Sequence, residues 1–219
     1  MTKNMHLVIV TDCGGSDEGR YGIAARRSFH PHNIGLTFFA TAPLNTLHSG
    51  FTGAAQALSS IDHFGPLQGD EAYGLLVNAA PREGSSAGKK LRGAGRKSGG
   101  EEIYALKLRN GVWVVGPNAG YNLHFLACQV EESYLVVDNS KRETPFRSMQ
   151  VMVPALAKLL EASPMPHLEF EPKPLVLPEV EEGTFVADCD ELGNVYLVTV
   201  GERETWFPAL GESCVAVIN

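Results

Sequence analysis

The fold of this chain is decided by the stretch Leu7-Val8-Ile9-Val10-Thr11-Asp12-Cys13-Gly14-Gly15-Ser16-Asp17. Its first residues form a short apolar run, and the residues from Asp12 onward are typical of a turn. Residues 21–29 then place apolar side chains at helical spacing until Pro31, and residues 34–40 form a second apolar run. A strand, a loop, a helix and another strand in this order predict the opening of an α/β fold.

Further segments continue this alternation of strands and helices. The pattern predicts helices at 50–61 and 151–160 and strands at 73–77, 103–108, 112–115 and 134–137. The turn Arg109-Asn110-Gly111 predicts a hairpin between two of the strands, because Asn-Gly favours tight hairpin turns. Residues 1–162 are therefore predicted to form an N-terminal α/β sheet domain.

A proline-rich segment follows this domain. Residues 163–178 contain five prolines, which cannot continue a helix, so the segment is predicted to be an extended linker. Apolar or alternating runs without a helix between them then follow at 184–187, 195–200 and 214–218. Residues 179–219 are therefore predicted to form a small, abbreviated C-terminal β domain.

The composition is that of an ordinary globular protein, with 219 residues, 44% hydrophobic and 20% charged. Every apolar run is shorter than the roughly 18 residues of a membrane helix, and residues 7–10 are too few for the core of a signal peptide. We therefore expect a cytoplasmic protein that makes no membrane contact. The net charge of −7 argues against a nucleic-acid partner, because Lys and Arg supply most of the affinity for phosphates. A small organic ligand is the more natural partner.

The cysteines give no sign of a metal or disulfide site. They lie far apart, without a CxxC pair or a histidine at ligand spacing, at Cys13, Cys128, Cys189 and Cys214. We expect reduced, buried thiols, no metal ion and no resident cofactor.

Residues 84–100 differ from the rest of the chain in composition. They contain six glycines, three serines and five Lys or Arg residues, with almost no apolar side chains. Such a segment is typical of a surface insertion, since it buries too little area to offset the entropy of ordering. The alternative is a basic lid over an anionic ligand, although the glycines do not match a phosphate-binding loop.

Three motifs occur in an order and at spacings that indicate a family. They are Val10-Thr11-Asp12-Cys13-Gly14-Gly15-Ser16-Asp17, Gly116-Pro117-Asn118-Ala119-Gly120 and Asp190-Glu191-Leu192-Gly193-Asn194. They resemble the T/S-D-x-G-x-x-D, G-P-D/N-N-G and D-x-F-G-N motifs of the SAM hydroxide adenosyltransferase and fluorinase/chlorinase family. Weaker similarities lie at 42–45 and at Pro154, so the resemblance extends over roughly the whole chain.

The resemblance implies a set of ligand contacts. It places Asp12 on the ribose hydroxyls of SAM, Asp17 and Asp190 near the methionine amino group, and Asn194 near the adenine. A carboxylate that follows the first strand suits a ribose diol, because ligands of α/β sheets sit outside the carboxyl ends of the strands. Further binding residues implied by the matching segments are Asn45, Asn118 and Ser213. The family holds SAM between one subunit's N-terminal domain and a neighbour's C-terminal domain, usually in a trimer, so a homo-oligomer is expected.

Each of these side chains also has a plainer structural use. Asp12 can cap the helix that follows it or stabilise the turn. Asp17, Asp190 and Asn194 can likewise serve the chemistry of a loop or hairpin. The sequence leaves these alternatives open.

The residues that activate water in the family are changed here. The family's D-P-G-V-G-T-x-R segment has Asn78 at its Asp position and Glu101 at its Arg position, with Arg82 as a possible substitute. The His of its F-H-G-R-D segment is replaced by Arg147. An amide cannot accept a proton as a carboxylate does, and an Arg with a pKa above about 12 is no base at neutral pH. Hydrolysis of SAM is therefore expected to be slow or absent, and Glu101 could pair with Arg147 or act as a relocated base.

Three functions are consistent with these residues. The chain could bind SAM and cleave its C5′–sulfur bond by nucleophilic attack, which releases methionine; the sulfonium is a good leaving group and could react without a general base. It could instead bind SAM, adenosine or another ligand without turnover. It could also be an assembly protein with a vestigial pocket.

Overall fold

The computed structural model describes residues 4–11, 16–40, 71–79, 102–119, 122–140, 146–177, 183–189 and 195–200. It divides the chain into two compact units, Met1–Pro178 and Glu179–Asn219. The predicted helix at 50–61, the basic segment 84–100 and the predicted strand at 214–218 lie outside the described residues.

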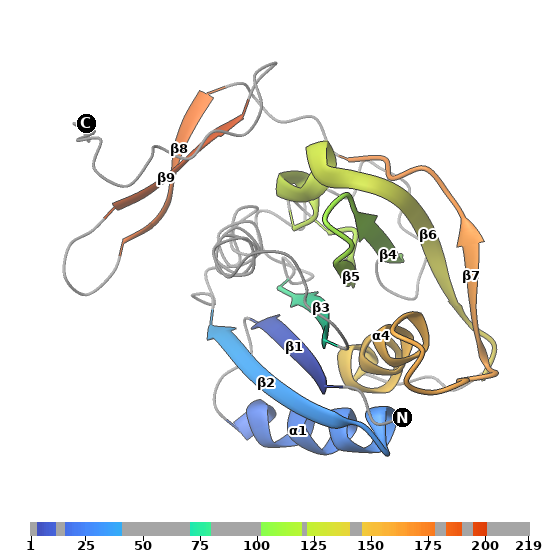
Figure 1. Cartoon of the computed structure of the whole chain (residues 1–219). Helices are drawn as coiled ribbons and strands as arrows, with labels where there is room; N and C mark the ends of the chain where they lie inside the picture. The colour runs from blue at the N-terminus through green and yellow to red at the C-terminus, as the bar shows by residue number, and fades with distance from the viewer. Residues whose placement is uncertain are drawn as a thin grey trace. The chain divides into compact units, whose positions relative to one another are not determined.

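The described part of the first unit is built on one mixed sheet of seven strands in the order β2-β1-β3-β5-β4-β6-β7 (Figure 1). The strands are β1 (Asn4–Thr11), β2 (Asn33–Ala40), β3 (Glu71–Asn78), β4 (Ile103–Leu108), β5 (Trp113–Pro117), β6 (Val130–Asp138) and β7 (Leu168–Pro172). β2, β1, β3 and β5 run parallel, and β4, β6 and β7 pair antiparallel with their neighbours. A mixed sheet with packed helices is an α/β fold, as the sequence predicts.

Helices of the first unit pack on one face of this sheet (Figure 1). They are α1 (Ser16–Phe29), the π-helical turn η3 (Ser148–Met152) and α4 (Val153–Leu159), while the 3-10 helix η2 (His124–Gln129) leads directly into β6. Met5, Leu7 and Ile9 alternate along β1 into the same buried cluster as Tyr21 and Phe29 of α1. Burial of each large apolar side chain stabilises the fold by roughly 1.5–3 kcal/mol, so this face is the main core.

The hairpin between β4 and β5 forms at the predicted turn. Gly111 has a φ of +86°, which L side chains rarely adopt. The side-chain oxygen of Asn110 accepts a hydrogen bond from the backbone N–H of Val112 at 3.2 Å. The Asn-Gly pair therefore supplies both the backbone freedom and the hydrogen bond that close the turn.

Residues 163–178 differ from the predicted linker, because five of them form β7 and pair with β6. Leu168 is buried and Phe170 packs against the core, whereas Glu169 and Glu171 are exposed. This period-two alternation is typical of a strand, and β7 lies at one end of the strand order, where proline is tolerated. The prolines therefore exclude a helix without excluding a strand.

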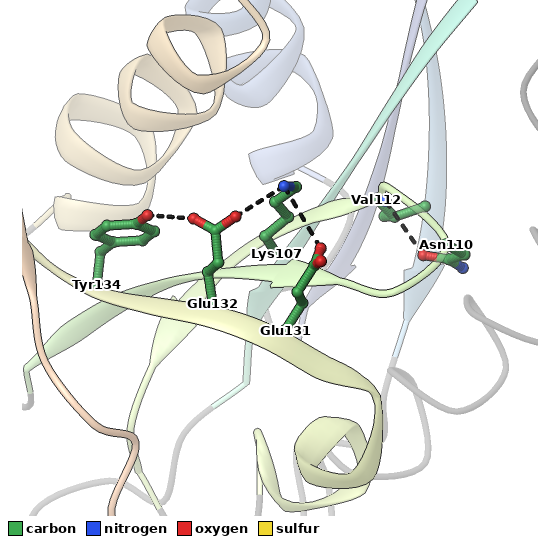
Figure 2. A network of polar contacts seen from close by, with 6 residues as sticks. All are labelled: Lys107, Asn110, Val112, Glu131, Glu132 and Tyr134. Carbon is green, nitrogen blue, oxygen red and sulfur yellow. Dashed lines mark hydrogen bonds and ion pairs between the residues drawn. The ribbon is translucent and has the colours of Figure 1, made fainter.

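A charged network joins β4 to β6 across the sheet (Figure 2). Lys107 Nζ lies 2.8 Å from Glu132 Oε1 and 3.4 Å from Glu131 Oε2, and the Tyr134 hydroxyl donates to Glu132. The hydrogen bond from Lys107 lowers the pKa of Glu132, and the same contact raises the pKa of Lys107. Lys107 and Glu132 are direct cross-strand partners, so this network helps to fix the register of the two strands.

In the second unit the structure describes β8 (Gly183–Cys189) and β9 (Val195–Val200), which pair antiparallel. Among the described residues, every helix is too short or too polar to span a bilayer.

His6 lies on the sheet face opposite the main core and is half-buried. Its Nε2 is 2.8 Å from the Thr37 hydroxyl of β2, and its ring lies 5.6 Å from the ring of Tyr73. Burial lowers the pKa of His6 below its ordinary value of 6.5, because the charged form loses solvation.

We predict that the stability of the protein falls as the pH is lowered through about 6.5 toward the lower pKa of folded His6. In this interval the unfolded state binds more protons than the folded state, so the free energy of unfolding is greatest above it. Urea unfolding at a series of pH values measures the slope of the free energy of unfolding against pH. His6→Gln should flatten this slope, and an unchanged slope in His6→Gln would contradict the assignment.

Candidate functional site

The carboxyl ends of the parallel strands form the edge of the sheet where α/β proteins bind ligands. Thr11, the last residue of β1, is the direct partner of Asn78, the last residue of β3. Two polar residues that are 67 positions apart in the sequence therefore end side by side at this edge.

Asn78 joins this edge to the first helix. Its Nδ2 donates to the hydroxyl of Tyr21 on α1 at 2.7 Å and lies 3.5 Å from the Thr11 hydroxyl. Thr11 and Tyr21 are buried, with 3% and 0% of their surfaces exposed. All three residues also make further interactions. The amide of Asn78 thus serves as a hydrogen-bond donor between β1, β3 and α1.

The chemistry of this cluster differs from that of a carboxylate at the same position. A carboxylate accepts hydrogen bonds and can take a proton, whereas an amide N–H can only donate. Tyr21 and Thr11 accept from Asn78, so the arrangement suits an amide and leaves Asn78 no capacity for general base catalysis.

Gly116, the first residue of the Gly116-Pro117-Asn118-Ala119 segment, packs directly against the end of β3. A Cβ atom at Gly116 would lie 3.0 Å from the Val77 carbonyl oxygen, 3.2 Å from Val77 Cβ and 3.1 Å from Leu123 Cδ2. The glycine of this motif is therefore required for the close approach of two backbones.

Asn118, a predicted ligand residue, hydrogen-bonds to protein in this structure. Its Nδ2 donates to the Val176 carbonyl at 2.8 Å, and its backbone N–H donates to the Glu102 carbonyl at 2.8 Å. The first bond fastens the segment that follows β7 to the turn that follows β5. Asn118 therefore holds the chain at this edge through its side-chain amide.

Sequence reasoning missed Asn122, whose side chain is 0% exposed. Its Nδ2 donates to the carbonyl of Ala79, the residue after Asn78. Its Oδ1 is buried and has no hydrogen-bond partner within the part of the chain that the structure describes. A buried acceptor without a hydrogen-bond partner is unusual and marks Asn122 as a candidate site residue. The only sign of Asn122 in the sequence was its position two residues after the Gly-Pro-Asn-Ala-Gly motif.

Asp17 and Arg147 lie on neighbouring elements. Asp17 is in the first turn of α1, where a carboxylate is favoured by the helix dipole, and pairs with Arg20 at 2.8 Å. The Arg20 guanidinium lies over the ring of Phe146, 5.6 Å from its centroid, and Arg147 follows directly and immediately precedes η3. Arg147 is half-buried and has an interaction partner. The start of α1 and the start of η3 thus bring both residues to one region.

The remaining predicted site residues lie outside the described ranges. They are Asp12, Asn45, Arg82, Glu101, Asp190, Asn194 and Ser213. Their roles, and the predicted pairing of Glu101 with Arg147, stay predictions. Within the described ranges, no three His, Cys, Asp or Glu side chains lie close enough together to hold a metal ion.

Comparison with known proteins bears on the fold. No family model and no curated protein matches the chain. An uncharacterized conserved protein from Thermotoga maritima has a similar structure, with a TM-score of 0.55 and 19% identity over 87% of this chain and 70% of that one. A conserved hypothetical protein from Thermus thermophilus gives a TM-score of 0.48 and 20% identity over 93% and 79% of the two chains. The first likeness supports the α/β fold alone.

We predict that Gly116→Ala lowers the free energy of unfolding by about 1–3 kcal/mol, because the new methyl group meets the Val77 carbonyl oxygen, a backbone atom that cannot move aside easily. Denaturant unfolding measures this change. Gly19→Ala in α1 is the matched control, since a Cβ there meets no atom within 4 Å. It should stabilise the protein by roughly 0.5–1 kcal/mol through helix propensity. Equal effects of the two substitutions would contradict the packing argument.

Proposed function

We propose that the chain is a SAM-binding protein that resembles SAM hydroxide adenosyltransferases and hydrolyses SAM slowly or not at all. The ligand, SAM or adenosine, would lie at the carboxyl ends of β1 and β3, with Asp12 on its ribose. The observation that carries the proposal is the donor role of Asn78 toward Tyr21 and Thr11. Through these hydrogen bonds Asn78 holds the ends of β1 and β3 together. It does so without the carboxylate that accepts a proton at this position in the family.

Loss of the base need not remove every reaction of SAM. The sulfonium leaves readily, so a positioned and desolvated nucleophile other than activated water could attack C5′ and release methionine. Binding without turnover is the alternative within the same proposal. The position of Asn78 favours binding over hydrolysis, because water at this site would lack a general base.

The rest of the proposal follows the resemblance. It includes a small C-terminal β domain, a homotrimer in which a neighbour's C-terminal domain completes the SAM site, and a cytoplasmic location. Asp17, Asp190 and Asn194 would contact the methionine and adenine ends of the ligand. Asn118 would support the site indirectly, because its side-chain amide donates to the Val176 carbonyl and so holds the segment that follows β7.

We predict that titration calorimetry of the full chain shows saturable binding of SAM or adenosine. In the companion assay, protein with SAM in water and in chloride should release no adenosine above a heat-treated control. Chlorinated nucleoside and methionine, followed in the same samples, identify attack by halide or by another nucleophile. Absence of saturable heat would remove the binding proposal, and rapid release of adenosine would contradict the loss of water activation.

A variant pair tests the role of the Asn78 cluster. Tyr21→Phe keeps the buried ring but removes the hydroxyl that accepts from Asn78, so binding should weaken roughly five-fold, equivalent to about 1 kcal/mol. Tyr134→Phe removes a hydroxyl from the network on β6 and should leave binding unchanged. Asp12→Ala should abolish binding altogether. Thermal unfolding of each variant separates lost affinity from lost folding.

A further inference from the structure

A polar hollow lies at the amino ends of the same parallel strands. It is a cavity of about 320 Å³ at the starts of β1, β2 and β3, which we call the amino-end pocket. The side chains and the glycine that matter for its chemistry are Asn4, His6, Asn33, Gly35, Glu71 and Tyr73. Its volume is at the lower end of the range for small-molecule sites. The candidate SAM site is at the carboxyl ends of these strands, so the two sites occupy opposite edges of the sheet.

The strand register arranges these residues in two rows. Asn4 of β1 is the partner of both Asn33 and Glu71, and His6 is the partner of both Gly35 and Tyr73. Paired residues of parallel strands point to the same face, and the two rows are two residues apart, so all of them share one face. The first row therefore holds the polar side chains of Asn33, Asn4 and Glu71. The second row, beside it, holds the rings of His6 and Tyr73.

Gly35 makes room for the aromatic row. A Cβ atom at position 35 would lie 2.7 Å from His6 Nδ1, so the imidazole occupies the space where a side chain would stand. The bond of Nε2 to Thr37 at 2.8 Å holds this orientation, and the Tyr73 ring lies 5.6 Å away at a tilt of 38°. The held imidazole and the neighbouring Tyr73 ring thus form an aromatic wall.

The polar row presents acceptors. Glu71 is exposed, and no Lys, Arg or His of the described ranges forms an ion pair with it. Asn33 Nδ2 donates to Asn4 Oδ1 at 3.3 Å, which leaves the carbonyl oxygen of Asn33 as a second acceptor beside the carboxylate. Glu71 and Tyr73 are two residues apart on β3, so the carboxylate and the aromatic side chain stand on the same face of the sheet. A carboxylate and an aromatic ring on one face offer the chemistry that binds an organic cation.

We propose that the amino-end pocket binds an organic ammonium group, with Glu71 as its counter-ion and the Tyr73 and His6 rings as its aromatic wall. The ammonium can belong to a free amine or to a lysyl side chain, which offer the same chemistry. The proposal does not depend on SAM binding, because none of its residues lies at the carboxyl edge.

Saturation-transfer NMR of the full chain with tyramine and with N-acetyl-lysine amide tests both sources. At least one should bind saturably, and the tighter of the two identifies a free amine or a lysyl side chain as the natural source. 4-(2-Hydroxyethyl)phenol carries the ring of tyramine with a hydroxyl in place of the ammonium, so it should bind several-fold more weakly than tyramine. Saturating adenosine should not displace either amine, which separates this pocket from the proposed SAM site.

Substitutions complete the test. Glu71→Gln removes the charge from an exposed side chain and should raise the dissociation constant of the amine about five-fold. Tyr73→Leu should raise it roughly three-fold through loss of the aromatic face. Glu169→Gln, an exposed carboxylate on β7, is the matched control and should change nothing. If neither amine binds saturably up to about 10 mM, the dissociation constant is too high for a specific site and the proposal is overturned. Equal binding of the amine by Glu71→Gln and by the wild type would also overturn it.

Discussion

The parallel pairing of β1 with β2 on one side and β3 on the other is the constraint on which the first unit depends. It places Met5, Leu7 and Ile9 on the core face, under α1 and α4. Because the three strands are in register along their whole length, their ends meet at two edges. The carboxyl edge gathers Thr11 and Asn78, and the amino edge gathers the residues around His6. One sheet therefore offers two chemically distinct edges.

The Asn78 cluster shows how one buried amide can join two strands and a helix. Under the proposed resemblance, this position would hold a carboxylate that polarises water. The amide instead donates to two buried hydroxyls and fixes β3 to α1 and β1. Asn122 supports the same strand end through the Ala79 carbonyl, and its buried Oδ1 adds an acceptor beside the site. The proposed binding of a nucleoside without proton transfer is compatible with this arrangement.

Local patterns predicted most of the described elements, because the periods of strands and helices are properties of neighbouring residues. The hairpin followed from Asn110 and Gly111, and β1 followed from its apolar run. β7 was missed because the prolines around it outweighed the alternation at 168–171. The contacts of Asn78 with Tyr21 and of Asn118 with Val176 join residues 57 or more positions apart, so no local pattern could predict them. The motif positions thus indicated the region of the candidate site and not the partners of its side chains.

The bond between Asn118 and the Val176 carbonyl has a mechanical consequence. Val176 is largely exposed, with 72% of its surface accessible, so its own side chain adds little apolar packing beside this hydrogen bond. A force directed along the backbone beyond Leu177 would therefore load the side chain of Asn118 and, through its N–H bond to Glu102, the ends of β4 and β5. Tension where the chain leaves the first unit is thus transmitted to the same turn that packs against the end of β3.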